Sequence, residues 1–378
     1  MFSATPLDIR PGSGIGIFEL GTSLWTVIEQ LRSSQNLFPQ VEVKYDPELS
    51  STTPVILHLR PHFDLLFSGR QQRLHTICLR GLRQQPHMAL LYKNSEIISS
   101  GEALSRVKVS RTFGPTYAGN ELKYPGVWFS FEEDATDESS GGANFSADGR
   151  NQEVKRIFVV QKPSNGENHD GTNEVVVCPP MYGDISRAIA KIHHGVVLYF
   201  YPPGVPSLHI RIGETSAQDL NVDLGPPNRI HYKEDERMTI HSPQCSEENP
   251  GSDYFYNYFQ HGIDFLISGR THILQKIIIH SNVPGSPLFL RYKRCPWELE
   301  GKPEDDEDGT PPTRHFDEKF DIINHFLGPQ GSPPSMLLDR TVDEEGITLP
   351  NSETQLHGYD GLILEVSEAS YVLSVVIF

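Results

Sequence analysis

Apolar and polar residues alternate along several short stretches of the chain, a pattern typical of β-strands with one buried face. The clearest stretches are residues 63–79 and 263–279, which align without gaps and share seven identities over 17 positions. Each stretch has an apolar run, a Ser-Gly-Arg step and a second alternating run. The pattern predicts a β-hairpin in each stretch, and we expect the glycine to supply the positive φ of the turn.

Two weaker copies follow the same plan at residues 126–160 and 361–378. A helical pattern precedes each hairpin. In the first, apolar residues recur at helical spacing from Leu24 to Leu31, after a Thr or Ser that can cap the helix. The other three helical patterns end in Gly followed by Pro, which stops a helix because proline cannot continue it. These three stops are at residues 113–115, 224–227 and 327–329.

From these patterns we predict an α+β fold of four repeated helix-plus-antiparallel-β-hairpin modules, paired into two lobes. The N-terminal lobe is expected at 15–165, with a disordered insert at about 133–152 that is rich in acidic residues, Ser and Gly. The C-terminal lobe is expected at 175–378, with an acidic linker at about 300–314.

The charge balance argues against nucleic acid as a partner. The chain has 32 Lys and Arg against 49 Asp and Glu, a formal net charge of −17 at pH 7, which repels phosphate backbones. Residues 1–125 differ, with 13 basic and 10 acidic residues. Five arginines cluster there, and they form either a solvated strand face or a patch for anionic headgroups or an acidic partner. They are Arg60, Arg70, Arg73, Arg80 and Arg83.

No motif in the chain indicates catalysis, a cofactor or a metal. The four cysteines lie far apart and form no C-x-x-C pair, so we expect free thiols in a reducing cytosol. The glycines at 12–16 lack the third glycine of a dinucleotide-binding loop, and no H-E-x-x-H, P-loop or G-x-S-x-G occurs. No apolar stretch approaches the ~18–20 residues of a membrane span, and the N-terminus lacks the apolar region of a secretory signal.

One segment is unusually aromatic. Residues 253–259 contain five aromatic side chains, and alternation places Tyr254, Tyr256 and Tyr258 on one face of a strand. These tyrosines form either the partly solvent-exposed side of an ordinary strand or a recognition face. Tyrosine suits a recognition face because it offers a large contact area at low entropic cost.

The third hairpin and its surroundings resemble the phagosome assembly factor family. The resemblance covers about residues 15–378 and is densest between 230 and 295. It is carried by Tyr232-Lys233-Glu234, Met238-Thr239-Ile240-His241-Ser242-Pro243, Asp253-Tyr254-Phe255-Tyr256-Asn257-Tyr258-Phe259, Gly262-Ile263-Asp264, His280-Ser281-Asn282-Val283-Pro284-Gly285, Arg294-Cys295 and the N-terminal Phe18-Glu19-Leu20-Gly21.

This resemblance implies a non-enzymatic autophagy adaptor in the cytoplasm that is recruited to the phagophore assembly site. It implies a complex with a WD40 β-propeller partner, the breast-carcinoma-amplified-sequence protein. Because phosphoinositide binding is ascribed mainly to the propeller, the membrane association of this chain would be indirect. The resemblance supplies no catalytic residue.

We expect the partner to contact the exposed side of the third hairpin unit. The candidate contact residues are Tyr254, Tyr256, Tyr258, His280, Asn282 and Pro284. Two alternatives stay open: direct phosphoinositide binding by the arginine patch, and an enzyme without a recognisable motif. An enzyme would show a deep pocket with convergent polar groups.

Overall fold

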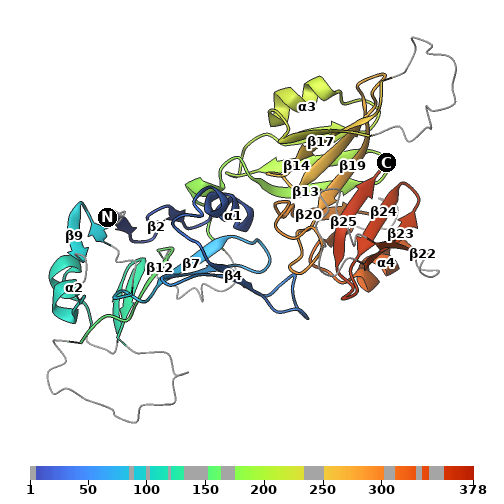
Figure 1. Cartoon of the computed structure of the whole chain (residues 1–378). Helices are drawn as coiled ribbons and strands as arrows, with labels where there is room; N and C mark the ends of the chain where they lie inside the picture. The colour runs from blue at the N-terminus through green and yellow to red at the C-terminus, as the bar shows by residue number, and fades with distance from the viewer. Residues whose placement is uncertain are drawn as a thin grey trace. The chain divides into compact units, whose positions relative to one another are not determined.

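The computed structural model describes residues 6–84, 89–98, 103–117, 121–131, 152–162, 175–233, 251–301, 311–328, 334–339 and 353–378. The chain divides into two units (Figure 1). Unit 1 consists of Met1–Asp46 and Thr52–Pro180, and unit 2 consists of Pro47–Ser51 and Met181–Phe378. A short segment of the N-terminal half, Pro47–Ser51, therefore belongs to unit 2.

Unit 1 contains a five-stranded and a seven-stranded sheet. The five-stranded sheet has the order β3 (Phe18–Glu19), β2 (Gly14–Ile15), β1 (Leu7–Arg10), β8 (Leu90–Tyr92), β9 (Ser95–Ile98). The seven-stranded sheet has the order β10 (Glu121–Tyr124), β11 (Val127–Ser130), β12 (Arg156–Val160), β7 (Leu74–Leu79), β6 (Phe63–Phe67), β5 (Val55–Leu59), β4 (Val41–Lys44). All neighbouring strands in unit 1 are antiparallel except β1 and β8, which are parallel.

Unit 2 repeats this arrangement with one more strand. Its five-stranded sheet has the order β15 (Leu208–Arg211), β14 (Gly195–Phe200), β13 (Ile185–Lys191), β20 (Trp297–Glu300), β21 (Thr313–His315). Its eight-stranded sheet has the order β16 (Arg229–Tyr232), β17 (Tyr254–Tyr258), β18 (Ile263–Ile267), β19 (Leu274–His280), β25 (Val372–Ile377), β24 (Leu362–Val366), β23 (Glu353–Tyr359), β22 (Ser335–Asp339). Unit 2 also contains a parallel pair of strands, β13 and β20, which corresponds to the β1–β8 pair of unit 1.

Four short helices accompany the sheets among the described residues: α1 (Leu24–Ser33), α2 (Arg106–Phe113), α3 (Ala217–Leu224) and α4 (Phe320–Leu327). The side chain of Ser23 caps α1 by accepting from the Thr26 N–H, which confirms the predicted start. The last three helices end where the Gly-Pro stops predicted, immediately before Gly114, Gly225 and Gly328.

The core of each unit lies on the inner face of its larger sheet. In unit 2, apolar side chains of the eight-stranded sheet pack against the five-stranded sheet, α3 and α4 in one hydrophobic cluster. Figure 1 shows α3 beside β17 and α4 beside β23. The Tyr258 hydroxyl donates to the Gly225 carbonyl at the end of α3, and the Tyr359 hydroxyl donates to Asn324 of α4. The opposite, outer face of the eight-stranded sheet carries Asp264, His280 and Glu365.

The predicted α+β fold of four helix-plus-antiparallel-hairpin modules is wrong. The described residues form a mostly β structure with four multi-stranded sheets, and the hairpins are central parts of the two larger sheets. Several of the strands that the prediction missed are short or edge strands, such as β2, β3 and β9, whose alternation is too brief to stand out. It also missed the longer β13 inside the smaller sheet of unit 2. Alternation within a strand also does not reveal which distant strand pairs with it in parallel, as β1 does with β8.

The expected role of the hairpin glycines is also corrected. Positive φ occurs at Gln72 and His272 (49° and 56°), whereas neither Gly69 nor Gly269 has it. Glycine is required there because the backbone that leads into the neighbouring strand passes close by. A Cβ on Gly69 would lie 1.9 Å from the Thr52 carbonyl oxygen, and a Cβ on Gly269 would lie 2.0 Å from the Gly251 carbonyl oxygen.

Two predicted segments fall largely outside the described residues. Of the insert expected at 133–152, the structure describes Gln152 alone. Of the linker expected at 300–314, residues 302–310 are outside the description. Its two ends lie opposite each other, because Glu300 of β20 pairs with Thr313 of β21.

Candidate functional site

The carboxylate of Asp264 in β18 is the centre of a polar network among the described residues of unit 2. The Asp264 Oδ2 accepts hydrogen bonds from His280 Nε2 (2.9 Å) and from the Tyr292 hydroxyl (2.8 Å), and Oδ1 accepts from Asn257 Nδ2 (2.8 Å). The residue is only 4% exposed. Three donors therefore replace the water that a buried carboxylate loses.

The hairpin register explains why these groups meet. Asp264 lies opposite Ile278, so His280 stands two residues further along β19 on the same outer face. Residues 281–296, hereafter the capping loop, follow β19 and bring Tyr292 back to the outer face of the sheet. The imidazole of His280 and the phenol ring of Tyr292 stack with centroids 3.7 Å apart and planes 16° from parallel.

Arg294 holds the two ends of the capping loop together. Its guanidinium donates from Nε to the Ser281 carbonyl (2.8 Å), from Nη2 to the Asn282 carbonyl (3.3 Å) and from Nη1 to the Ser51 carbonyl (3.1 Å). Burial lowers the pKa of Arg294 to about 9, although the charge of Asp317 opposes the shift. The side chain stays charged at neutral pH, which keeps all three bonds charge-assisted.

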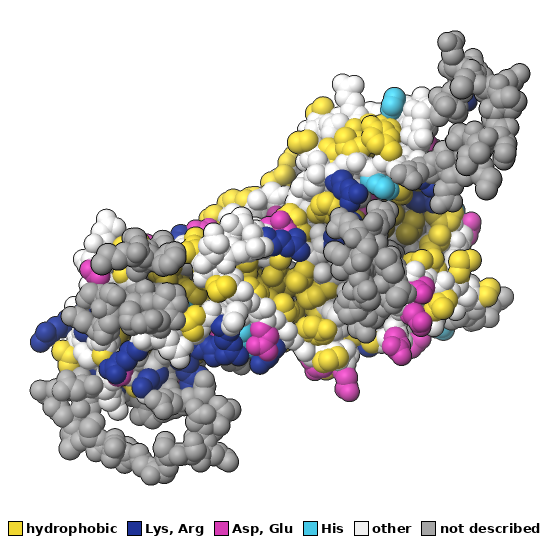
Figure 2. Space-filling model, viewed as in Figure 1, with side chains coloured by type: hydrophobic (Ala, Val, Ile, Leu, Met, Phe, Trp, Pro, Cys, Tyr) yellow, Lys and Arg dark blue, Asp and Glu magenta, His cyan; other side chains and the backbone are white. Residues whose placement is uncertain are grey.

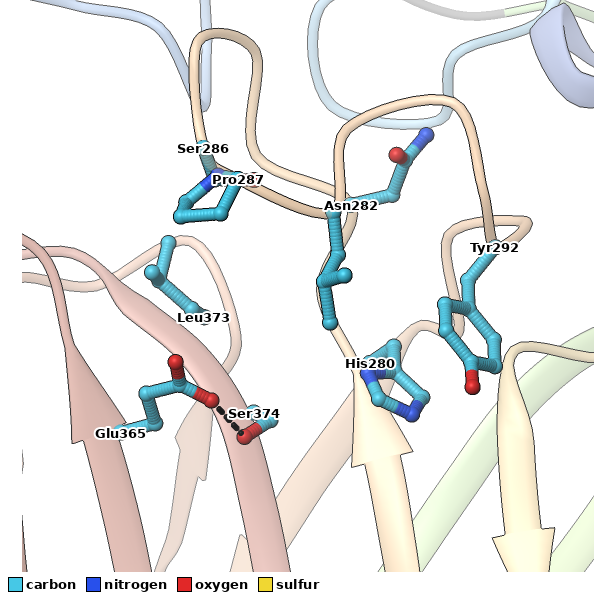
Figure 3. A pocket seen from close by; sticks show the side chains of 9 residues that line it. His280, Asn282, Ser286, Pro287, Tyr292, Glu365, Leu373 and Ser374 are labelled. Atoms are coloured by element: carbon cyan, nitrogen blue, oxygen red, sulfur yellow. Dashed lines mark hydrogen bonds between the residues drawn. The ribbon is translucent and has the colours of Figure 1, made fainter. Parts of the chain in front are cut away.

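A small pocket opens between the capping loop and the β24–β25 strands (Figure 3). Its polar wall contains Glu365, which is 4% exposed and accepts hydrogen bonds from the hydroxyls of Thr354 (2.9 Å) and Ser374 (2.8 Å). Figure 3 shows Glu365 and Ser374 on the strand side and His280 and Tyr292 on the loop side. The lining residues are His280, Asn282, Ser286, Pro287, Leu288, Tyr292, Glu365, Leu373 and Ser374.

The chemistry available in this pocket is that of a fixed polar network. A carboxylate bonded to an imidazole orients that ring, an arrangement that also serves general bases. Within the described ranges, no hydroxyl or thiol group is hydrogen-bonded to His280, and no group of three His, Cys, Asp or Glu side chains could hold a metal ion. Among the pocket residues, Asn282 and Tyr292 hold the capping loop in place through their hydrogen bonds to Leu290 and Asp264.

The three tyrosines predicted as a contact face lie on the inner side of the sheet. Tyr254, Tyr256 and Tyr258 are 7%, 9% and 0% exposed, and they belong to the hydrophobic core of unit 2. Burial raises the pKa of Tyr254 to about 12 and also raises the pKa of Tyr258. The expectation that this face is exposed was wrong, because alternation shows which side chains share a face but not which face is buried.

The other three candidate contacts belong to the capping loop and its base. His280 and Asn282 are 7% and 4% exposed, and Pro284 is buried. Asn282 has a positive φ of 45°, and its Oδ1 accepts from the Leu290 N–H (2.8 Å) across the loop. The structure thus brings these three residues together, but it uses them to build the loop.

The five candidate arginines of unit 1 differ in their surroundings. Arg60 pairs with Glu42 (3.3 Å), Arg80 with Asp64 (2.9 Å) and Arg83 with Glu153 (2.5 Å). Arg73 is buried and donates to the Gly21 carbonyl (3.3 Å), whereas Arg70 is exposed. They do not form one free basic patch, because four of the five hold the fold or an acidic neighbour.

Sequence reasoning missed Tyr292, Arg294 and Glu365 as members of the site. Asp264 had a signal, since it is one of the seven identities between the two hairpins. Arg294 stands in the segment that carries the family resemblance. Tyr292 and Glu365 had no signal, because their contacts with residues far along the chain depend on the loop and on strand order.

The described helices include none that is long and apolar enough to cross a membrane.

Comparisons with known proteins give a consistent result. The family model described as phagosome assembly factor 1 matches residues 14–378. The chain is similar to PHAF1 proteins of Arabidopsis thaliana (28% identical, covering 99% of this chain and 93% of the relative) and Drosophila melanogaster (25%, 98% and 94%). A PHAF1 protein of Caenorhabditis elegans is 22% identical over 96% of this chain and 90% of its own length. No solved structure matches. Since the family model covers nearly the whole sequence, the chain belongs to the phagosome assembly factor 1 family.

Proposed function

We propose that this protein is a non-enzymatic adaptor in autophagy that binds a WD40 β-propeller protein of the breast-carcinoma-amplified-sequence family. It acts at the phagophore assembly site, and its membrane association is indirect, through the propeller. The observation that carries this proposal is the family match over residues 14–378. The family is named for assembly, and assembly requires binding surfaces.

The polar network of unit 2 supports this proposal. Asp264 is saturated by three donors and Glu365 by two hydroxyls, and both carboxylates are almost fully buried. The Asp264 carboxylate holds Tyr292 of the capping loop against the sheet, and the Glu365 carboxylate joins β23, β24 and β25. Rigid, preordered surfaces bind partners at a lower entropic cost than mobile ones.

Co-expression with the propeller protein, followed by size-exclusion chromatography, tests the proposal. A single species containing both chains, which persists after dilution to nanomolar concentration, is the expected result. Separate elution under the same conditions would contradict it. Asp360→Asn is a suitable control variant, because the Asp360 side chain is 98% exposed and its replacement should leave the complex intact.

A second candidate function is direct binding to phosphoinositide headgroups by unit 1. The described residues of unit 1 contain 16 Lys and Arg against 9 Asp and Glu, whereas those of unit 2 contain 12 against 17. Flotation of the chain alone with phosphoinositide vesicles at low salt tests this function. Binding that is lost in Arg70→Glu would support it, and no flotation would contradict it.

A further inference from the structure

The outer face of the seven-stranded sheet in unit 1 is built differently from its counterpart in unit 2. Strand order makes β6 and β7 the counterparts of β18 and β19, so Asp64 corresponds to Asp264 and Arg80 to His280. The capping loop of unit 2 leaves the Asp264 and His280 side chains 6% and 9% exposed. In unit 1 the Asp64 and Arg80 side chains are 15% and 24% exposed. The same face is therefore more open in unit 1.

This open face has an apolar centre. Register places Phe158 of β12 beside Trp128 of β11 and Cys78 of β7, and the Trp128 and Phe158 rings stack with centroids 4.9 Å apart. Trp128 and Phe158 are only partly buried. The neighbouring Ile56 and Leu66, which are also half-buried, extend the apolar surface across β5 and β6.

Basic side chains surround this centre. By register the outer face carries five Lys and Arg and three Asp and Glu. The basic residues are Lys44, Arg60, Arg80, Lys123 and Arg156, and the acidic residues are Glu42, Asp64 and Glu121. The described residues of unit 1 also have a basic excess, 16 Lys and Arg against 9 Asp and Glu, and Figure 2 shows Lys and Arg side chains gathered over this unit.

Two of these cations lie opposite each other. The antiparallel pair Leu79–Ile157 places Arg80 and Arg156, one residue further, directly across from each other on the outer face. Like charges in this position repel each other. Asp64 pairs with Arg80 (2.9 Å), so a carboxylate supplied from outside would pair with Arg156 and offset the remaining repulsion. Tryptophan, phenylalanine and arginine are also residue types that are enriched at protein–protein interfaces.

We propose that the outer face of the unit 1 sheet, centred on Trp128, Phe158 and Arg156, binds an acidic polypeptide segment that carries aromatic residues. Carboxylates of the segment pair with Arg156 and with Lys123, whose ammonium lies 3.2 Å from the partly exposed Glu121 carboxylate and would exchange that partner. An aromatic side chain of the segment covers the Trp128–Phe158 stack. The inference goes beyond the proposed function, because it assigns a surface and a partner chemistry that hold whether or not the propeller is the partner.

A polypeptide fits this face better than a membrane or a nucleic acid. Trp128 and Phe158 lie flat against each other and do not project as a membrane-inserting side chain would. Glu42, Asp64 and Glu121 are interspersed among the cations and would repel a continuous phosphate chain. Spaced carboxylates on an extended segment can reach the cations and avoid the acidic residues.

The test uses the full chain and a fluorescein-labelled copolymer of glutamate and tyrosine, followed by fluorescence anisotropy. We expect saturable binding that weakens with salt, and no binding of a lysine–tyrosine copolymer. Arg156→Glu and Lys123→Glu should each weaken binding by about tenfold. The Lys123 side chain is 74% exposed, so its replacement tests the surface without a risk to folding.

Arg211→Glu is the matched control, because it makes the same charge change at a side chain in unit 2 that is 63% exposed. It should leave binding within about twofold of the unsubstituted chain. Hydrogen exchange with the copolymer bound should show protection of peptides covering residues 127–130 and 156–160. Melting temperatures of all variants show whether each is folded.

Three results would overturn the proposal. In the first, Arg156→Glu and Lys123→Glu bind as well as the unsubstituted chain. In the second, Arg211→Glu loses as much affinity as they do, so that net charge alone explains binding. In the third, anionic vesicles or polyuridylate bind more tightly than the copolymer with the same dependence on Arg156, which would identify a different class of partner.

Discussion

Asp264 and His280 stand 16 residues apart in the sequence and are joined by a 2.9 Å hydrogen bond on the outer face of the unit 2 sheet. Unit 1 has the same relationship between Asp64 and Arg80, with the same sequence separation and the same 2.9 Å distance. In both units an acidic residue on the first strand of a hairpin meets a basic side chain at the end of the second. In unit 2, Tyr292 of the capping loop also donates to Asp264 and helps to bury the polar network. The corresponding face of unit 1 is more exposed.

Asp264→Ala should destabilise unit 2 strongly. The change leaves Tyr292, His280 and Asn257 without their common acceptor, and we expect the free energy of unfolding to fall by about 3 kcal/mol. Urea denaturation followed by tyrosine and tryptophan fluorescence measures it. Asp360→Ala, at an exposed carboxylate, should change stability by less than about 0.5 kcal/mol. Equal effects of the two substitutions would refute the structural role of Asp264.

Arg294→Lys should loosen the capping loop although it keeps the charge. A lysine ammonium cannot reach three carbonyls with the geometry of the guanidinium that bonds Ser51, Ser281 and Asn282. We expect a loss of about 2 kcal/mol and faster hydrogen exchange in peptides covering 47–51 and 281–296. Arg291→Lys, in the same loop, is the comparison variant. Unchanged exchange in both peptides would show that Arg294 does not hold the loop.

Tyr258→Phe should lower stability by about 1 kcal/mol, because the lost hydroxyl donates to the Gly225 carbonyl that ends α3 (2.9 Å). Tyr232→Phe should have almost no effect, since Tyr232 is 62% exposed. Thermal melts of both variants check this prediction. A change of the same size in both would count against it. Triple replacement of Tyr254, Tyr256 and Tyr258 by Ala should unfold unit 2, so loss of partner binding in that variant would not locate an interface.

Stability should fall below pH 6.5, partly because of His261. Burial, helped by the charge of Lys293 and opposed by Asp184, lowers the pKa of His261 to about 4. Because the folded pKa lies below the ordinary value of 6.5, the unfolded chain binds more protons between pH 6.5 and 4. The contribution of neutral His261 is thus complete above pH 6.5 and decreases as the pH falls towards 4.

Melting temperatures from pH 7.5 to 4.5 measure this effect. His261→Gln removes the titrating group and should give a shallower fall than the unsubstituted chain. His75, whose pKa burial also lowers to about 4, should behave in the same way in a His75→Gln variant. Parallel curves for all three proteins would show that these histidines do not contribute to the pH dependence.

Much of the local structure and the family were predictable from the pattern of residues. The Ser23 cap and the three Gly-Pro stops predicted helix ends that the structure confirms, because caps and stops act within one turn of the backbone. The hairpins at 63–79 and 263–279 were also predicted, since alternation and turn residues lie within a few positions of each other. The resemblance identified the family that the comparison with known proteins confirms.

The order of the sheets, the choice of buried face and the site depend on packing between distant parts of the chain. Leu7 pairs with Leu90 across a long connection, which no local pattern records. Alternation placed Tyr254, Tyr256 and Tyr258 on one face of a strand but could not show that this face is buried. The register of β17 with β18 then places Asp264 on the opposite face. Packing against α3 and the five-stranded sheet decided that orientation. The capping loop then buried Asp264 on the other face, because Arg294 and Tyr292 return to the strand that the chain had left.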